Sequence, residues 1–240
     1  MPDPSPNSPR KMKQVLKIAA LTLVCGYVLY QAAYLGWTHS GSNEWKLTSD
    51  EDGIKLWSLK TPGVALLKVK GEMRIAARLS TLMAMLEDED AQASADMSKV
   101  AVLERKDTPQ LTLVYHDYVE VFPPPLGRRE FILQTHHSQD PVTRKIEVSV
   151  LAAPNRLPPR ADIVRIEHLH NIWVLNPLPN GEVDLQLFAD VDLGGNIPDF
   201  VQNMIMPQIV KLMFTSLRNK STWERFVHAH VLYIKEPGES

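Results

Sequence analysis

The sequence predicts an α+β fold in which helices lie on one face of a curved antiparallel sheet, preceded by one membrane-spanning helix. Three observations carry this prediction. An uncharged apolar stretch lies near the N-terminus, strand-like segments rich in β-branched residues follow one another between residues 100 and 193, and a long helical segment closes the chain. With 240 residues, 44% of them hydrophobic and 22% charged, the chain has a globular composition and enough apolar side chains for a core.

Charge and cysteine content exclude two classes of protein. The formal net charge of −2 provides no positive field for a nucleic acid backbone, so we expect no nucleic-acid partner. Cys25 is the only cysteine, which excludes an internal disulfide and a cysteine-rich zinc site. We therefore expect the hydrophobic core to hold the fold together.

The first forty residues are typical of a membrane anchor. Residues 1–17 carry four cations and one anion, and residues 18–38 carry no charge. Those 21 residues match the ~20 that cross a hydrocarbon layer of ~30 Å. A cleaved signal peptide is the alternative, but the candidate cleavage site at residues 31–33 has a bulky glutamine where a small residue is preferred.

The flanking residues predict the orientation of this anchor. Cations ahead of an apolar span keep the N-terminus in the cytoplasm, and Tyr27, Tyr30, Tyr34 and Trp37 gather toward the other end as an interfacial aromatic belt does. We expect a cytoplasmic basic tail at 1–17, a transmembrane anchor or uncleaved signal at 18–38, and one domain at 39–240. That domain would lie outside the cytoplasm, in the periplasm of a Gram-negative source.

The domain begins with two predicted strands and a helix. The strands cover residues 54–59 and 64–75, and Pro62 and Gly63 between them are a turn signal. Residues 76–96 are rich in Ala, Leu, Met and Glu. Leu79, Leu82 and Leu86 recur there at helical spacing, which predicts a helix with one apolar stripe.

A run of strands and a closing helix follow. Strands are predicted at 100–105, 111–121, 129–137, 145–153, 163–175 and 183–193, the last two joined by a turn at 177–181. Gly194 and Gly195 end the sheet. A helix is predicted over residues 197–228, with Pro198 in its first turn and a kink or local break at Pro207.

Four short motifs in this order resemble the START domain, the lipid-transfer module of the steroidogenic acute regulatory protein and its relatives. They are DGIKLW at 52–57, the Arg129-Glu130-Phe131 triplet, PPRADIVRIEHLHNIWVLNPL at 158–178 and DVDLGGNIP at 190–198. The resemblance implies a helix-grip fold, in which a curved antiparallel sheet wraps around the C-terminal helix and a tunnel between them holds one lipid. Glu130 stands where the family has aspartate.

The resemblance also bears on the ligand. Some sterol-binding members carry an arginine inside the cavity four residues after the phenylalanine of that triplet, and here the position is Thr135. This argues against a sterol as the specific ligand and leaves a hydrophobic ligand in general as the expected partner.

The closing helix has apolar residues on more than one side, which predicts two roles. Val201, Met204, Gln208 and Leu212 recur at helical spacing and are predicted to line the tunnel, together with Thr135 and His116 from the strands. The opposite strip consists of Met206, Ile209 and Met213. The family places a nearby loop, which carries Arg156 and Arg160, at the tunnel mouth. We predict that the strip and this loop together form a lid that dips into the membrane. Two solvated arginines on a proline-stiffened loop are the alternative for that loop.

Two other chemistries remain open as alternatives. The pairs His168 and His170, and His228 and His230, have the two-residue spacing of metal ligands on a strand, but no thiol or carboxylate ligand pattern accompanies them. A further possibility is a cyclase or aromatase on the same fold, with polar cavity groups at Tyr115, His116 and Asp117. A third hypothesis is a non-catalytic scaffold whose cavity is filled by side chains. We expect no catalytic residue, no metal and no cofactor.

Overall fold

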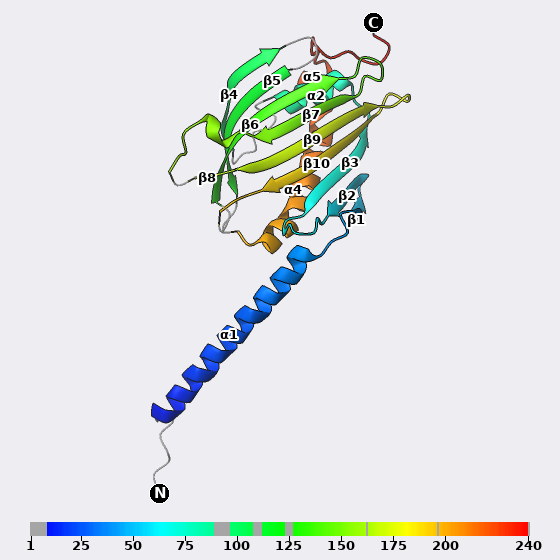
Figure 1. Ribbon diagram of the computed structural model, residues 1–240. Helices are drawn as coiled ribbons and strands as arrows, with labels where there is room; N and C mark the ends of the chain where they lie inside the picture. Colours follow the sequence, from blue (N-terminus) through cyan, green and yellow to red (C-terminus); the bar gives the residue numbers. More distant parts are fainter. Residues whose placement is uncertain are drawn as a thin grey trace.

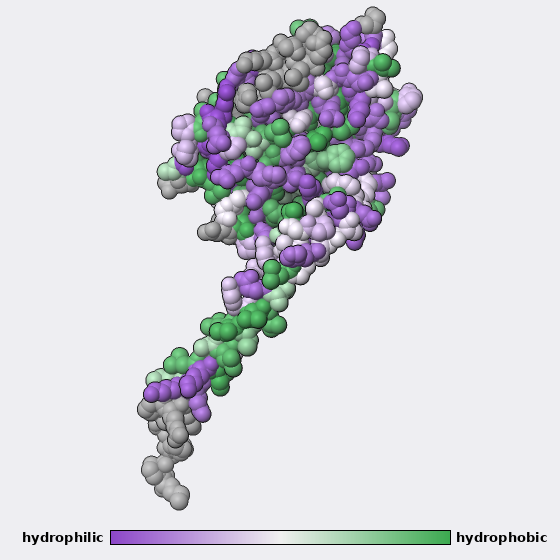
Figure 2. Space-filling model, in the orientation of Figure 1, coloured by the Kyte–Doolittle hydropathy of each residue, from purple (hydrophilic) through white to green (hydrophobic). Residues whose placement is uncertain are grey.

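The computed structural model describes residues 9–88, 97–107, 112–122, 127–161, 163–195 and 197–239. Helix α1 (Pro9–His39) projects from a single α+β domain (Figure 1). Its segment Met12–His39 is long and apolar enough to cross a membrane. Figure 2 shows the apolar surface of this helix in contrast to the largely polar surface of the domain.

The domain is built on one curved ten-stranded sheet with the strand order β1-β2-β3-β10-β9-β7-β6-β5-β4. All neighbours along this path are antiparallel, and β8 adds a short parallel pair with β6. The strands are β1 (Trp45–Glu51), β2 (Ile54–Leu59), β3 (Lys68–Ile75), β4 (Met97–Asp107), β5 (Thr112–Phe122), β6 (Gly127–Gln139), β7 (Ile146–Ala152), β8 (Val164–Arg165), β9 (His168–Pro177) and β10 (Val183–Asp192).

Three helices complete the described part of the domain. α2 (Leu79–Glu87) follows β3, and α4 (Asp199–Lys220) crosses the sheet against β2 and β3, behind the strands in Figure 1. The short α5 (Glu224–Val227) follows α4, and a 3-10 turn, η1 (Pro154–Arg156), follows β7. This is the predicted α+β arrangement, with the helices against one face of a curved sheet.

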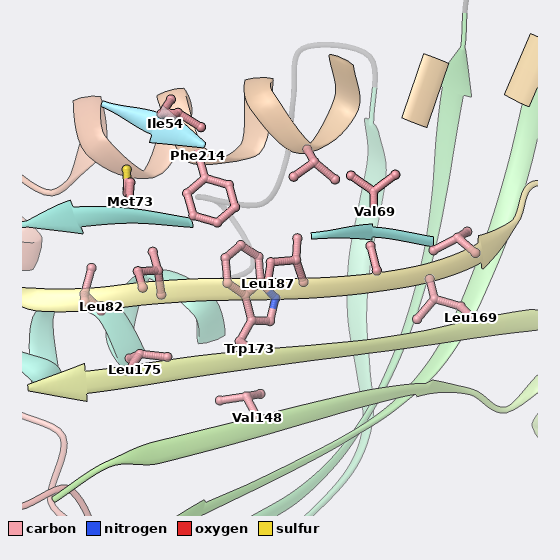
Figure 3. Packing of buried hydrophobic residues seen from close by; sticks show 14 of the residues in the cluster. Ile54, Val69, Met73, Leu82, Val148, Leu169, Trp173, Leu175, Leu187 and Phe214 are labelled. Atoms are coloured by element: carbon pink, nitrogen blue, oxygen red, sulfur yellow. The ribbon is translucent and has the colours of Figure 1, made fainter. Parts of the chain in front are cut away.

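The inward face of the sheet is apolar because its strands alternate. Along β10, buried residues alternate with half-buried ones, as expected of a strand with one face on the core. Phe214 of α4 is fully buried and lies beside Trp173 of β9, with ring centroids 5.6 Å apart (Figure 3). The core therefore lies between α4 and the concave face of the sheet.

Several predicted boundaries are wrong. The predicted strand at 163–175 is two strands, because Val164 and Arg165 pair with Arg129 and Glu130 of β6 before the chain turns into β9. The predicted helix at 197–228 ends as α4 at Lys220, and Pro207 lies within α4 without interrupting it. The second predicted strand begins at Lys68 instead of residue 64, and the edge strand β1 was not predicted. Residues 89–96 of the predicted helix at 76–96 lie outside the described residues.

Candidate functional site

The inward face of α4 is a row of residues spaced four apart. Gln202, Met206, Val210 and Phe214 are the buried residues of this helix. The Gln202 side-chain oxygen accepts a hydrogen bond of 2.8 Å from the backbone N–H of Leu193, which follows β10. This bond fixes the rotation of the helix start relative to the sheet.

The structure contradicts the predicted tunnel face of α4. Met204 and Leu212 are 65% and 68% exposed, and Gln208 is exposed as well. Val201 is half-buried and packs at the edge of the core. The prediction chose the wrong stripe because both sides of the helix are apolar, and helical spacing groups residues without stating which group faces inward.

The opposite strip was also assigned wrongly. Met206 is only 7% exposed, and Ile209 and Met213 pack against the core from the flanks of the buried row. Met206 is therefore buried in the core, and Ile209 and Met213 are only partly exposed. The apolar side chains that α4 exposes are instead Phe200, Met204 and Leu212.

A cross-strand row on the concave face includes two polar side chains. Directly opposite residues of antiparallel strands point to the same side of a sheet. Thr135 of β6 is opposite Val150 of β7, which is opposite Asn171 of β9, and the row continues through Ala189 to Val69. Because Val69 and Ala189 are buried core residues, Thr135 and Asn171 share the inward face.

Asn171 is the feature of this face that sequence reasoning missed. Its side-chain oxygen Oδ1 is buried, and none of the described groups donates a hydrogen bond to it. A buried polar atom without a partner is costly, so such an atom is suited to accept a hydrogen bond from a bound molecule. The sequence signal that could have found it is its position midway between Leu169 and Trp173, because alternation along a strand turns all three side chains to the same face.

Three further predicted residues fall on β5. His116 pairs with Leu133 of β6, and Tyr115 and Asp117 are its neighbours along the strand. The side chains of these three residues lie outside the described part of the chain.

The Arg129-Glu130 pair holds two loops at the end of the sheet where α4 begins. Arg129 donates hydrogen bonds to the carbonyl oxygens of Leu193 and Gly194, at 3.3 and 3.4 Å, and burial lowers the pKa of its guanidinium. Glu130 is fully buried and forms ion pairs with Arg160, at 2.9 Å, and with Arg165. The motif therefore fastens the turn before α4 and the loop that follows β7.

Arg165 extends this hold on the loop. It donates hydrogen bonds to the carbonyl oxygens of Pro154, Leu157 and Pro158, the last two at 3.0 and 2.8 Å. Arg156 in the same loop forms an ion pair with Glu104 of β4. Both arginines predicted to meet lipid headgroups, Arg156 and Arg160, are thus paired with carboxylates of the protein itself.

The histidine pairs are not brought together with other ligands. Within the described residues, no group of three or more His, Cys, Asp or Glu side chains is placed to hold a metal ion. His168 Nε2 instead lies 3.0 Å from Asp190 Oδ1. The other carboxylate oxygen of Asp190, Oδ2, forms an ion pair with Lys68 Nζ at 2.7 Å. Burial would raise the pKa of Asp190, but the hydrogen bonds from Lys68 and His168 outweigh it and hold that pKa below its ordinary value.

Comparison with known proteins identifies the fold. A STAR-related lipid transfer protein from Xanthomonas axonopodis is 27% identical, with a TM-score of 0.66 over 74% of this chain and 98% of that one. Human StAR-related lipid transfer protein 5 is 16% identical, with a TM-score of 0.62 over 84% of this chain and 94% of that one. An uncharacterised protein of Pseudomonas aeruginosa is 25% identical over 68% of this chain and 79% of its own length. No family model matches the sequence.

These similarities confirm the START-like fold that the sequence motifs suggested. The likeness to the human protein shows the fold alone, whereas the bacterial structure is similar in both fold and sequence. The names of both proteins describe lipid transfer, which is a property of those proteins.

Proposed function

We propose that this chain, which has the fold of the StAR-related lipid transfer domains, binds one hydrophobic molecule between its sheet and α4. The inward row from Thr135 to Val69 carries the proposal. It combines an apolar wall with a buried oxygen of Asn171 that no described group satisfies. Sites for apolar molecules are typically lined by hydrophobic side chains with a few placed polar groups.

The chemistry of this row supports a ligand with a neutral polar end. The amide oxygen of Asn171 accepts a hydrogen bond, and the hydroxyl of Thr135 can donate or accept one. No described charged side chain lies in the row from Thr135 to Val69. A hydroxyl or amide group on an otherwise apolar molecule suits these partners, and the proposal includes no catalytic step.

We further propose that the domain works beside a membrane. In this arrangement residues 1–17 form a cytoplasmic tail, 18–38 span the bilayer, and 39–240 lie on the far side. The four cations ahead of the apolar segment and the length of α1 support this topology. The loop after β7, held to β6 by Arg160 and Arg165 on Glu130, would move to admit the ligand.

Photoreactive lipids test the proposed site in the full chain. Fatty acid, phospholipid and sterol probes that carry a diazirine are added to membranes containing the protein, and labelled peptides are mapped by mass spectrometry. We expect at least one probe class to label β6, β7 or β9. Val150→Trp, which places a bulky ring between Thr135 and Asn171, should lower this labelling by roughly tenfold, the effect of about 1.4 kcal/mol.

Ser149→Trp is the matched control. Ser149 is the next residue on β7, and alternation turns it to the outer face of the sheet, opposite Ile172. Labelling should survive this change. Labelling that is confined to α1, or that is equal in the two variants, would show that the concave face holds no ligand.

A further inference from the structure

An apolar recess lies where α1 meets α4. It has a volume of about 410 Å³, within the range of small-molecule sites. Each helix contributes four residues to its wall: Tyr30, Ala33, Tyr34 and Trp37 from α1, and Asp199, Phe200, Asn203 and Met204 from α4. Phe200 and Met204 are each 65% exposed, so the recess is open to the surroundings of α1.

Specific hydrogen bonds hold the two helices at this junction. The Tyr34 hydroxyl donates to Asp199 Oδ2 at 3.0 Å. The Trp37 indole N–H donates to the carbonyl oxygen of Ala65 at 2.8 Å, and the Asn203 side-chain amide donates to the same oxygen at 3.1 Å. The end of α1, the loop between β2 and β3, and the start of α4 therefore meet at Ala65.

Lys60 closes the junction from the side of the domain. Its ammonium donates to the carbonyl oxygens of Thr38 and Ser40, at 3.1 and 3.2 Å, and lies 5.2 Å from the centre of the Trp37 ring. A cation at a helix C-terminus also complements the helix dipole. Gly41 passes close by with a φ of 115°, and a Cβ there would lie 2.3 Å from the Lys60 carbonyl oxygen. The end of α1 is thus fixed to the domain.

The position of the recess along α1 indicates which molecules surround it. Its α1 wall is the C-terminal end of the apolar segment Met12–His39, where tyrosine and tryptophan side chains mark a membrane interface. If α1 spans the bilayer as proposed, an open apolar recess at that depth is surrounded by lipids. Among its described wall residues, Asp199 alone is charged, which favours a headgroup that carries an ammonium over an anionic one.

We infer that this recess binds an acyl chain of a bilayer phospholipid such as phosphatidylethanolamine, in the membrane that α1 spans. The inference rests on the proposed anchoring of α1. It assigns the exposed residues Phe200 and Met204 to lipid contact, and it places the N-terminal end of α4 at the surface of the bilayer. The ligand site of the domain would then lie beside a lipid that is already bound.

A phosphatidylethanolamine with a diazirine in one acyl chain, incorporated into lipid nanodiscs with the full chain, tests the inference. We expect crosslinks to peptides that contain Phe200 and Met204. Met204→Trp, which fills the recess, should reduce these crosslinks by roughly tenfold, equivalent to about 1.4 kcal/mol of lost affinity. Leu212→Trp, two turns further on the exposed side of α4 and outside the recess, is the matched control and should leave them unchanged.

The outcomes separate this inference from the proposed function. Loss of the α4 crosslinks in Met204→Trp alone supports the lipid recess. Equal crosslinking in both variants, or crosslinks confined to the first half of α1, overturns the recess and leaves the ligand site on the concave face standing. Recovery of wild-type chain in the soluble fraction after alkaline extraction of membranes would overturn the anchoring and with it the recess.

Discussion

Gly71 shows how a single missing side chain sets the distance between helix and sheet. This residue lies within β3, and a Cβ added there would come 2.4 Å from Cε2 of Phe214 and 2.8 Å from Cγ1 of Val210. Both contacts are shorter than packed side chains allow. Gly71 therefore lets α4 approach the strand closely, which is a recognised role of glycine inside strands.

Replacing Gly71 by alanine should consequently destabilise the domain. Phe214 is fully buried and packs beside Trp173, so its ring would have to shift within the core to make room for the added methyl group. We expect Gly71→Ala to lower the free energy of unfolding by about 1–3 kcal/mol, the usual cost of overpacking. Urea unfolding followed by intrinsic tryptophan fluorescence measures this. The pair Gly71→Ala with Phe214→Leu should cost less than the sum of the single changes, and strict additivity would show that the two residues do not compete for space.

The sequence alone places some of the candidate site residues on the correct face and others on the wrong one. Thr135 falls on the inward face of the sheet, where the resemblance placed it, because strand alternation leaves only two choices. α4 offered no such guide, since apolar residues surround much of the helix and the decisive contacts, from Gln202 to Leu193 and from Phe214 to Trp173, join segments distant in the sequence. Alternation along β9 could have turned Asn171 inward, but its place in one row with Thr135 needed the register of three strands.

Among the elements, α2 depends on the C-terminal tail of the chain. Its N-cap position is Arg78, which supplies no capping side chain. Instead the carboxylate of Glu236 accepts hydrogen bonds from the backbone N–H groups of Leu79 and Ser80, at 3.0 and 2.9 Å. Ile234, two residues earlier, is 3% exposed in the core. The tail is thus part of the fold, and no local sequence signal at α2 could have predicted its cap.

Weakening this cap should have a measurable cost. We expect Glu236→Gln to lower the free energy of unfolding by about 1 kcal/mol, because the amide keeps only one acceptor oxygen and loses the charge that favours a helix N-terminus. Glu147→Gln, an exposed change on β7, is the matched control and should leave stability unchanged. Equal thermal unfolding midpoints for the two variants would mean that the carboxylate of Glu236 does not stabilise α2.

Other elements depended on tertiary pairing in the same way. The parallel pairing of β8 with Arg129 and Glu130 splits a segment whose composition reads as one continuous strand. β1 is an edge strand with mostly exposed residues, so it lacks the alternation that identifies a strand in sequence. Those strands that border the core on one face were predicted to within a few residues, because burial imposes the pattern.

For the whole molecule, the order of elements was predictable because strands, helix, further strands and a long closing helix leave few ways to bury their apolar faces. The contacts of α1 with the domain arise only after folding, when α1, the loop between β2 and β3, and α4 meet at Ala65. That junction joins α1 to the domain. In our account it holds the entrance of a lipid site next to the bilayer that supplies the ligand.

The central claim is that the concave face of the domain holds one hydrophobic molecule. Native mass spectrometry of the full chain, released from a membrane mimic, tests it most directly. Our account predicts that wild-type protein carries a noncovalent ligand that Ser149→Trp retains and Val150→Trp loses. Identical ligand masses on the wild type and Val150→Trp, or bare protein in every sample, would contradict it.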